Sequence, residues 1–306
     1  MRTYSFVTVD VFTDRRFGGN PLAVFPDASG LSDGEMQSLA AEFNLSETTF
    51  VVPPEDPSNT ARVRIFNRTS EMPFAGHPNV GTGWVLAGLG RDRDSVLRFE
   101  EIAGLVEVRV ERDGKGGKLH AVTIAAPQPL SLGAEMPVEL LAGCVGLDVS
   151  DVVVTAHRPI VASVGNSFVI AEVKAAALPR AAPDISRFRS AVEAFPTLGP
   201  RRLPLYLYAQ DGQNTGSSAD RTRLRARMFS PLSGTIEDAA TGSAATPLAA
   251  LLLSLTKDSE RRYDITQGVE MGRPSLLACS AWRAADGIRA NVGGGCVPVL
   301  KGEISL

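Results

Sequence analysis

The sequence of 306 residues contains only three cysteines and three histidines. Cys144, Cys279 and Cys296 are odd in number and widely spaced, which excludes a disulfide framework and indicates a reducing compartment. His120 and His157 have no cluster of cysteines or carboxylates around them at the spacing of metal ligands. We therefore expect neither a structural disulfide nor a bound metal.

The sequence also lacks an excess of one charge and a long hydrophobic run. Lys and Arg total 31 against 34 Asp and Glu, so there is no basic footprint for nucleic acid. The uncharged run 243–256 is too short to cross a bilayer, and the N-terminus lacks the apolar core of a signal peptide. The triple glycine at 293–295 precedes no helix and does not indicate a dinucleotide site. These features predict a cytoplasmic protein without a membrane partner, a nucleic-acid partner or a cofactor.

Residues 238–256 are the most distinctive segment that is present. Small or apolar residues occupy every face of a helix beginning near Ser243, which is typical of a helix buried all round. Gly242 lets backbone approach a ligand, and Ser243 is a favourable N-cap, so free N–H groups at this point favour an anion. Asp238 lies close by in the sequence. A helix start at Thr246-Pro247 is an alternative that would move this site by one turn.

The first half of the chain has a similar segment. Another uncharged stretch, 80–89, follows Gly76-His77-Pro78, with Pro78 expected at the first helical position. Upstream of each predicted helix lies an Arg-apolar-Phe strand end, Arg64-Ile65-Phe66 in one half and Arg227-Met228-Phe229 in the other. Two such units predict a duplication with the functional site between the halves.

The length favours two domains, and Pro127 and Pro129 mark the predicted boundary. We expect an N-terminal half over residues 1–126, joined by a last strand at about 297–306, and a C-terminal half over 127–296. Each half contains many predicted strands around one apolar helix, which is an α+β plan. Strands are expected at 4–12, 22–25, 47–52, 61–66, 96–100, 105–111, 119–125, 152–155, 167–173, 203–209, 221–229, 261–267, 274–280, 286–292 and 297–300, with a turn at 113–117 and helices at 137–143 and 184–195.

Glu47 is the first candidate for chemistry. Ser32 and Glu35 form a capping box for an amphipathic helix over 32–43, and Asn44 is a plausible stop. The β-rich segment that follows places Glu47 at the mouth of a strand. Residues 46–52 resemble 164–170, where Gly165 matches Glu47, so the two halves carry only one such carboxylate. This asymmetry favours a single proton-shuttling group.

Five motifs together carry a resemblance to a known family. They are Asp10-Val-Phe-Thr13, Phe17-Gly-Gly-Asn-Pro-Leu-Ala-Val24, Asn44-Leu-Ser-Glu-Thr-Thr-Phe-Val51, Met72-Pro-Phe-Ala-Gly-His-Pro78 and Glu237-Asp-Ala-Ala-Thr-Gly-Ser-Ala-Ala245. Gln267-Gly268 and Gly272-Arg-Pro-Ser275 also fit. In this order, the motifs resemble those of the phenazine-biosynthesis PhzF-like isomerases.

The resemblance implies a diaminopimelate-epimerase-like fold, in which two pseudo-symmetric domains each wrap a sheet around a central helix, and usually a homodimer. It implies that Glu47 is the acid/base that moves a proton on a small cyclic amino acid, with His77 and Asp238 as its partners. Gly76, Gly242 and Ser243 would bind the substrate carboxylate, and Asn20 would be a further substrate-binding residue beside them.

The departures from related enzymes narrow the chemistry. Where related epimerases and proline racemases have two thiols, this chain has His77 and Ser243, so a two-thiol racemase is not expected. Ala239 follows Asp238 where many members of the family have proline. Taken singly, Glu47 would be a solvated carboxylate, His77 a core histidine and Asp238 a turn cap. The alternatives are a non-catalytic protein that binds a small acid or forms a dimeric interaction module, and a dehydratase or epimerase of a hydroxylated amino acid.

Overall fold

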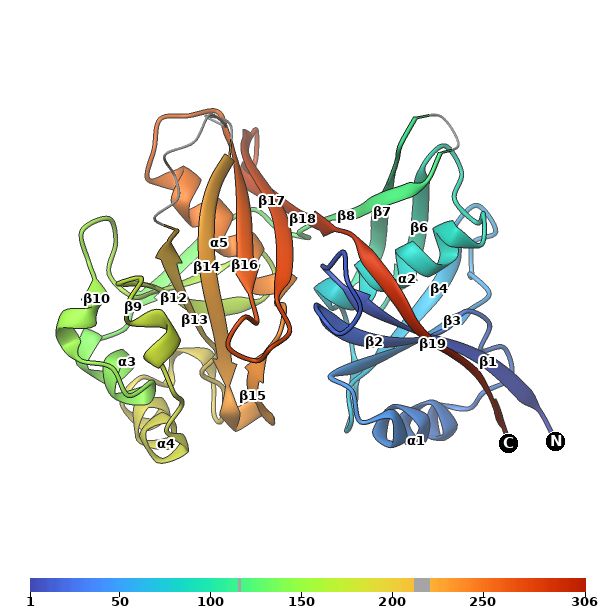
Figure 1. The fold of residues 1–306 in the computed structure, drawn as a ribbon, viewed down its shortest axis with the longest axis horizontal. Helices are drawn as coiled ribbons and strands as arrows, with labels where there is room; N and C mark the ends of the chain where they lie inside the picture. Colours follow the sequence, from blue (N-terminus) through green and yellow to red (C-terminus); the bar gives the residue numbers. More distant parts are fainter. Residues whose placement is uncertain (115–116, 212–220) are drawn as a thin grey trace. The chain divides into compact units, whose positions relative to one another are not determined.

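The computed structural model describes residues 1–114, 117–211 and 221–306. These residues form nineteen strands and only five α-helices, and the strands belong to a mixed sheet (Figure 1). The chain divides into two compact units, residues 1–125 with 293–306 and residues 126–292. The turn predicted at 113–117 lies partly outside the described residues.

The first unit is a mixed sheet that packs on helix α2 (Gly76–Gly88). Strand β2 runs parallel to β3, and β4 runs parallel to β6, whereas the other neighbours are antiparallel. Helix α2 contacts β1, β2, β3, β7 and β8 (Figure 1). The strands are β1 (Thr3–Val11), β2 (Asn20–Phe25), β3 (Glu47–Val52), β4 (Ala61–Phe66), β5 (Glu71–Met72), β6 (Val96–Glu101), β7 (Gly104–Arg112), β8 (Leu119–Ala125) and β19 (Cys296–Ser305).

Two glycines allow α2 to approach the sheet closely. A Cβ on Gly81 would lie 2.6 Å from Leu22 Cδ2, and a Cβ on Gly83 would lie 2.6 Å from Val108 Cγ1. Eleven of the thirteen helical residues are buried, which accounts for the uncharged sequence. The expectation that Pro78 is the first helical residue is wrong, because α2 begins at Gly76. Proline is tolerated at the third position because the first N–H groups of a helix have no partner within it.

The predictions around α1 (Asp33–Phe43) are confirmed. Ser32 is the N-cap and forms the capping box with Glu35, and Asn44 ends the helix in the left-handed conformation with φ of 52°. The local sequence determined both ends because each depends on contacts within a few residues. Glu47 then opens β3, as expected.

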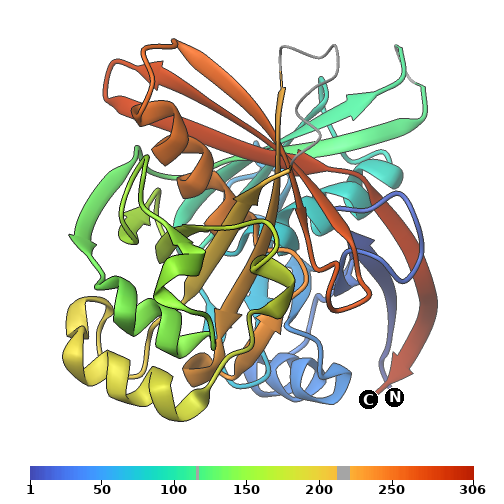
Figure 2. The same ribbon diagram turned by 60° about the vertical axis from the view of Figure 1, so that its left-hand side comes forward.

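The second unit packs helix α5 (Gly242–Ser254) against strands β11, β12, β16 and β17. Figure 2 shows α5 along these strands, with α3 (Val138–Cys144) and α4 (Ile185–Ala194) packed together at another place in the unit. Strand β12 runs parallel to β13, and β14 to β16. The strands are β9 (Ser131–Glu135), β10 (Val152–Val153), β11 (Ile160–Ser163), β12 (Ser167–Val173), β13 (Leu205–Gln210), β14 (Arg221–Ser230), β15 (Thr235–Asp238), β16 (Glu260–Gln267), β17 (Ser275–Ala284) and β18 (Gly287–Gly294).

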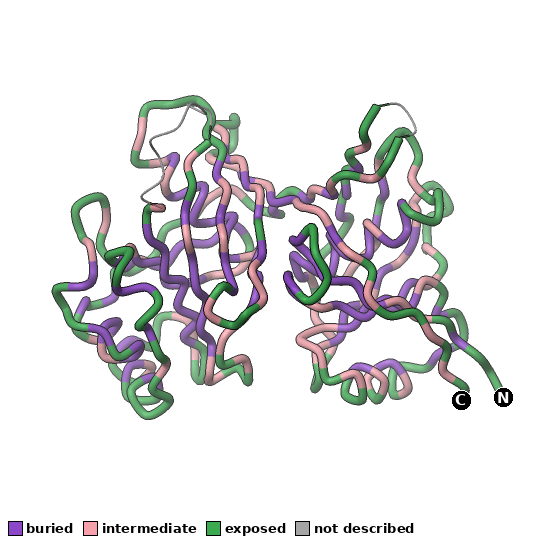
Figure 3. Tube along the Cα trace, in the orientation of Figure 1, coloured by how far each residue is buried: buried purple, intermediate pink, exposed green. Residues whose placement is uncertain are grey.

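Helix α5 does not start where the sequence suggested. Its N-cap is Thr241, so Ser243 is the second helical residue and Pro247 lies inside the helix. Both expected starts, with Ser243 as N-cap or at Thr246-Pro247, are therefore wrong. Pro247 has no N–H to donate to the Ser243 carbonyl, while Thr246 Oγ1 donates to the neighbouring Gly242 carbonyl at 3.1 Å. Burial along α2 and α5 is nearly continuous (Figure 3).

The order of strand pairing repeats from one unit to the other. Strands β1 to β4, β5 and β6 pair in the same sequence and sense as β11 to β14, β15 and β16. Phe50 pairs with Arg64 and Leu207 pairs with Arg227, so β3 corresponds to β13. The counterpart of Glu47 is therefore Pro204, and the expected match with Gly165 is wrong. The short similarity of residues 46–52 to 164–170 carried no information on pairing, although Pro204 also leaves Glu47 without a carboxylate counterpart.

Candidate active site

Glu47 and His77 lie beside each other within the first unit. Glu47 stands at the start of β3, and His77 is the second residue of α2. Their atoms Oε2 and Nε2 lie 3.3 Å apart, and the side chains are only 16% and 7% exposed. The two side chains are thus largely shielded from solvent and lie within the distance of an ion pair.

Asn20 and Ser46 fix the orientation of the histidine. Ser46 Oγ donates to Asn20 Oδ1 at 3.3 Å, which turns the amide so that Nδ2 faces His77 Nδ1 at 3.4 Å. With Nδ1 as the acceptor, neutral His77 carries its proton on Nε2, toward Glu47. This tautomer is assigned from the hydrogen-bond partners. Asn20, expected as a substrate-binding residue, thus contacts His77, and Ser46 was not among the expected site residues although it directly precedes Glu47.

Burial changes the acidity of Glu47. Loss of solvent raises the pKa of this carboxyl to about 7, while the polar Ser46 side chain and the charge of Arg68 act in the opposite direction. A carboxyl with a pKa near neutrality can both take and return a proton without a large free-energy difference. Glu47 therefore has the ionisation behaviour that a general acid/base needs.

Helices α2 and α5 begin in a similar way. Their N-caps, Ala75 and Thr241, make no side-chain capping bond, and neither helix has an acidic residue in its first turn. The first N–H groups of a helix have no partner within it and carry a partial positive charge. Gly76 and Gly242 are the first residues of these helices, so each helix start is suited to bind a carboxylate.

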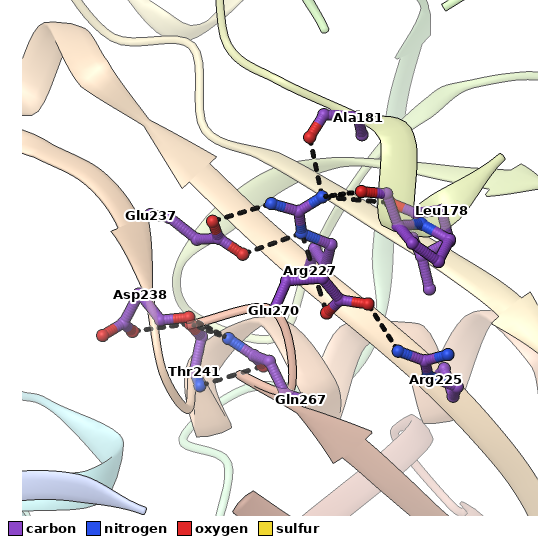
Figure 4. A network of polar contacts seen from close by, with 10 residues as sticks. Leu178, Ala181, Arg225, Arg227, Glu237, Asp238, Thr241, Gln267 and Glu270 are labelled. Atoms are coloured by element: carbon purple, nitrogen blue, oxygen red, sulfur yellow. Dashed lines mark hydrogen bonds and ion pairs between the residues drawn. The ribbon is translucent and has the colours of Figure 1, made fainter. Parts of the chain in front are cut away.

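Gln267 holds the loop between β15 and α5 in the second unit (Figure 4). Asp238 Oδ2 accepts a hydrogen bond from Thr241 Oγ1 at 2.6 Å. Gln267 Nε2 donates to the Asp238 carbonyl at 2.8 Å and to Thr241 Oγ1 at 3.0 Å, and Gln267 Oε1 accepts from the Thr241 amide and from Tyr206 Oη. The network fixes Asp238 at the end of β15, ahead of the first residue of α5, Gly242. Ser243, on the first turn of α5, is partly exposed.

An arginine clamp supports the same loop. Arg227 donates from Nε and Nη2 to the two carboxylate oxygens of Glu237, both at 2.8 Å, and from Nη1 to the Leu178 and Ala181 carbonyls (Figure 4). In the first unit Arg64 binds Glu71 in the same two-point manner at 2.7 Å. The Arg-apolar-Phe pattern in the sequence therefore marks a clamp that ties each strand end to the segment leading into a buried helix.

The three cysteines are not suited to act as catalytic groups. All three are buried and free, and burial raises the pKa of the Cys144 thiol to about 12 and that of Cys279 and Cys296 further. Such thiols are poor nucleophiles. Among residues 1–114, 117–211 and 221–306, no group of three or more His, Cys, Asp or Glu is placed to hold a metal ion. No helix in this part of the chain is long and apolar enough to cross a membrane.

The sequence and the fold agree on one family. The model of the phenazine biosynthesis-like protein family, PhzC-PhzF, matches residues 9–302, and the chain belongs to this family. It is 37% identical to the trans-2,3-dihydro-3-hydroxyanthranilate isomerase of Pseudomonas aeruginosa, over 94% of each chain. It is 34% identical, over the whole of both chains, to an uncharacterised isomerase of Mesorhizobium japonicum. The chain is thus an isomerase of the PhzF type.

The solved structures agree with the fold. The crystal structure of the Bacillus anthracis phenazine biosynthesis protein of the PhzF family matches with a TM-score of 0.86 over 100% of both chains, at 24% identity. At this identity the match supports the fold alone. A mixed, mostly stranded architecture with five α-helices among the described residues, like that of PhzF-family structures, is therefore observed.

Proposed function

We propose that this isomerase moves a proton between carbons of a small, carboxylate-bearing, cyclic amino-acid-like substrate without a cofactor. The observation that carries the proposal is the pair of Glu47 and His77, 3.3 Å apart, with the pKa of Glu47 raised by burial to about 7. The relative from Pseudomonas aeruginosa is named for a dihydro-hydroxyanthranilate, a molecule of this class.

In the proposed reaction, ionised Glu47 takes a proton from a ring carbon of the substrate. The electron pair of the broken C–H bond shifts along the conjugated system, and Glu47 returns the proton to another carbon. His77 donates a hydrogen bond from Nε2 to the developing negative charge or to Glu47 itself. The atoms balance, since substrate and product are isomers, and no oxidant or reductant is consumed.

The remaining site residues receive binding roles in this proposal. The amides at Gly76 and Gly242 and the hydroxyl of Ser243 bind carboxylate or other polar groups of the substrate, and Asp238 accepts from its amine or hydroxyl. Support comes from the two helix starts, whose N-cap residues make no side-chain capping bond, and from the network that fixes Asp238. We also propose a homodimer, on the strength of the family resemblance.

Proton NMR in deuterated water tests the function. The protein is mixed with trans-2,3-dihydro-3-hydroxyanthranilate and with a panel of small cyclic amino acids, including hydroxylated ones. The proposal predicts rearrangement of one substrate with solvent deuterium on a carbon of the product. Loss of water from a hydroxylated substrate would establish a dehydratase instead, and unchanged substrates with shifted protein resonances would indicate binding without turnover.

A further inference from the structure

Gln267 is a buried side chain to which the proposed reaction assigns no role. It is the last residue of β16 and is fully buried. It belongs to the Gln267-Gly268 motif, whose purpose the sequence does not reveal. The side-chain amide makes four hydrogen bonds, two at each end, so both protons of Nε2 and both lone pairs of Oε1 are used. A buried amide with all of its bonds made has a fixed orientation.

Two backbone groups determine which end of the amide is which. The Thr241 backbone N–H can only donate, and it lies 3.2 Å from Gln267 Oε1. The Asp238 carbonyl can only accept, and it lies 2.8 Å from Gln267 Nε2. The reversed amide would place nitrogen against the N–H and oxygen against the carbonyl. The orientation of Gln267 is therefore set by the backbone of the loop that it holds.

Tyr206 uses the second lone pair of the amide oxygen. Its Oη donates to Gln267 Oε1 at 3.1 Å. Burial raises the pKa of Tyr206 well above its ordinary value, so the phenol keeps the proton that it donates. Gln267 Oε1 thus faces two donors, and Nε2 faces the loop.

The orientation of Gln267 in turn fixes the Thr241 hydroxyl. Gln267 Nε2 donates its second proton to Thr241 Oγ1 at 3.0 Å, so the single proton of this hydroxyl must point elsewhere. Asp238 Oδ2 lies 2.6 Å from Thr241 Oγ1, which is the distance expected when a hydroxyl donates to an ionised carboxylate. The chain of donors therefore runs from Gln267 through Thr241 to Asp238 (Figure 4).

We propose that Gln267 is a positioning residue that orients the Thr241 hydroxyl toward Asp238 and so keeps the Asp238 carboxylate in the role of a hydrogen-bond acceptor. This inference rests on the proposed function, in which Asp238 accepts from an amine or hydroxyl of the substrate. An acceptor whose orientation is already fixed needs no reorganisation when that donor arrives. Gln267 acts through Thr241 rather than on the substrate.

The turn after Gln267 contacts the middle of the same loop. Gly268 has a φ of 74°, and a Cβ on it would lie 2.6 Å from the Ala239 carbonyl oxygen. Ser275, at the start of β17, donates from Oγ to that carbonyl at 2.9 Å. Because these contacts hold the loop independently of the Thr241 hydroxyl, removal of that hydroxyl should change its bond to Asp238 without releasing the loop.

Neutron crystallography of the deuterated protein tests the assignment without any substrate. The proposal predicts two deuterons on the Gln267 side-chain atom that faces the Asp238 carbonyl. It also predicts that the Thr241 hydroxyl deuteron lies on the line to Asp238 Oδ2. A hydroxyl deuteron directed at Gln267, or a deuteron bound to the Asp238 carboxyl, would overturn the proposal.

Turnover of the substrate tests the positioning role. Thr241→Val keeps the shape of the side chain but removes the hydroxyl, so it should lower kcat/KM by about tenfold, and Thr241→Ser should restore most of this loss. Thr246→Val is the matched control, because Thr246 is also buried but donates to the Gly242 carbonyl instead of Asp238. Equal losses in the two valine variants would show that the bond to Asp238 has no special role.

A double variant separates positioning from a general structural effect. Gln267→Glu replaces the donating Nε2 by an oxygen, which draws the Thr241 hydroxyl away from Asp238. This variant should lose about as much kcat/KM as Thr241→Val, and the double variant should lose no more, because both changes break the same bond. Additive losses would contradict the proposal. If Gln267→Glu does not fold, the Thr241 variants and the deuteron positions still decide.

The two kinds of measurement also separate this inference from the proposed function. If the deuterons lie as predicted but the wild type converts no substrate, the proposed function fails and the assignment of the hydrogen bonds stands. If the wild type is active and Thr241→Val is as active, the positioning role fails and the proposed function stands.

Discussion

His77 Nε2 lies 3.3 Å from Glu47 Oε2. Asn20 contacts the imidazole, and burial shields the carboxyl from solvent. The two residues come from a strand and a helix that meet only in the folded unit. The fold thus places a buried carboxyl, whose pKa is raised by burial to about 7, beside an imidazole that can hydrogen-bond to it.

The hydrogen bond from Asn20 should matter to turnover. Asn20→Ala leaves His77 free to change tautomer or to rotate, and losing one such bond lowers the exchange rate by about tenfold. Asn59→Ala is the matched control, since Asn59 also bonds a side chain of the first unit, the Glu100 carboxylate at 2.8 Å. The measurement is the steady-state rate at which each variant exchanges substrate protons with solvent deuterium. Equal rates for the two variants would contradict the role of Asn20.

The raised pKa of Glu47 should appear in the stability of the protein. Folding keeps the proton on Glu47 up to about pH 7, whereas the unfolded carboxyl loses it near its ordinary pKa of 4.5. The folded state thus binds more protons between these values, and the contribution of Glu47 to stability falls as pH rises through this window. The Glu47→Gln variant lacks this pH-dependent loss of stability. The difference in unfolding free energy between the variant and the wild type should therefore increase, in favour of the variant, by about 3 kcal/mol from pH 4.5 to 7.

Urea unfolding of both proteins across this range measures the difference. Glu42→Gln provides the control, because Glu42 is exposed and should show a flat difference. A flat difference for Glu47→Gln as well would mean that Glu47 is solvated in the folded protein.

The two arginine clamps should differ in strength. Arg227 and Glu237 are 7% and 15% exposed, whereas Arg64 and Glu71 are 16% and 24% exposed, and only Arg227 also binds buried carbonyls. Arg227→Met should therefore destabilise the protein by about 3–5 kcal/mol, as expected for a broken buried pair, and Arg64→Met by less. Chemical denaturation of the two variants measures this, and a larger loss for Arg64→Met would reverse the ranking.

Local signals explain what the sequence predicted well. The capping box of Ser32 and Glu35, the left-handed stop at Asn44 and the strand opening at Glu47 all depend on neighbours within a few residues. The uncharged composition of α2 likewise predicted its burial. The family motifs added Glu47, His77 and Asp238 as candidates.

Long-range pairing explains what the sequence did not reveal. The match of Glu47 with Gly165 was wrong because strand register depends on partners far away in the chain. The N-cap of α5 is Thr241 and not Ser243, because the Thr241 amide donates a hydrogen bond to Gln267 of the distant strand β16. Glu101 resembles any exposed carboxylate in the sequence, and only the packed unit shows that its oxygens are buried.

The central claim is that Glu47 moves the proton. The most direct measurement is the incorporation of solvent deuterium into the rearranged product by wild type, Glu47→Gln and Glu47→Asp, followed by NMR under identical conditions. The account predicts deuterium at one product carbon with wild type, a loss of about 10²- to 10⁴-fold with Glu47→Gln, and partial activity with Glu47→Asp. Full turnover and incorporation by Glu47→Gln would show that another group carries the proton.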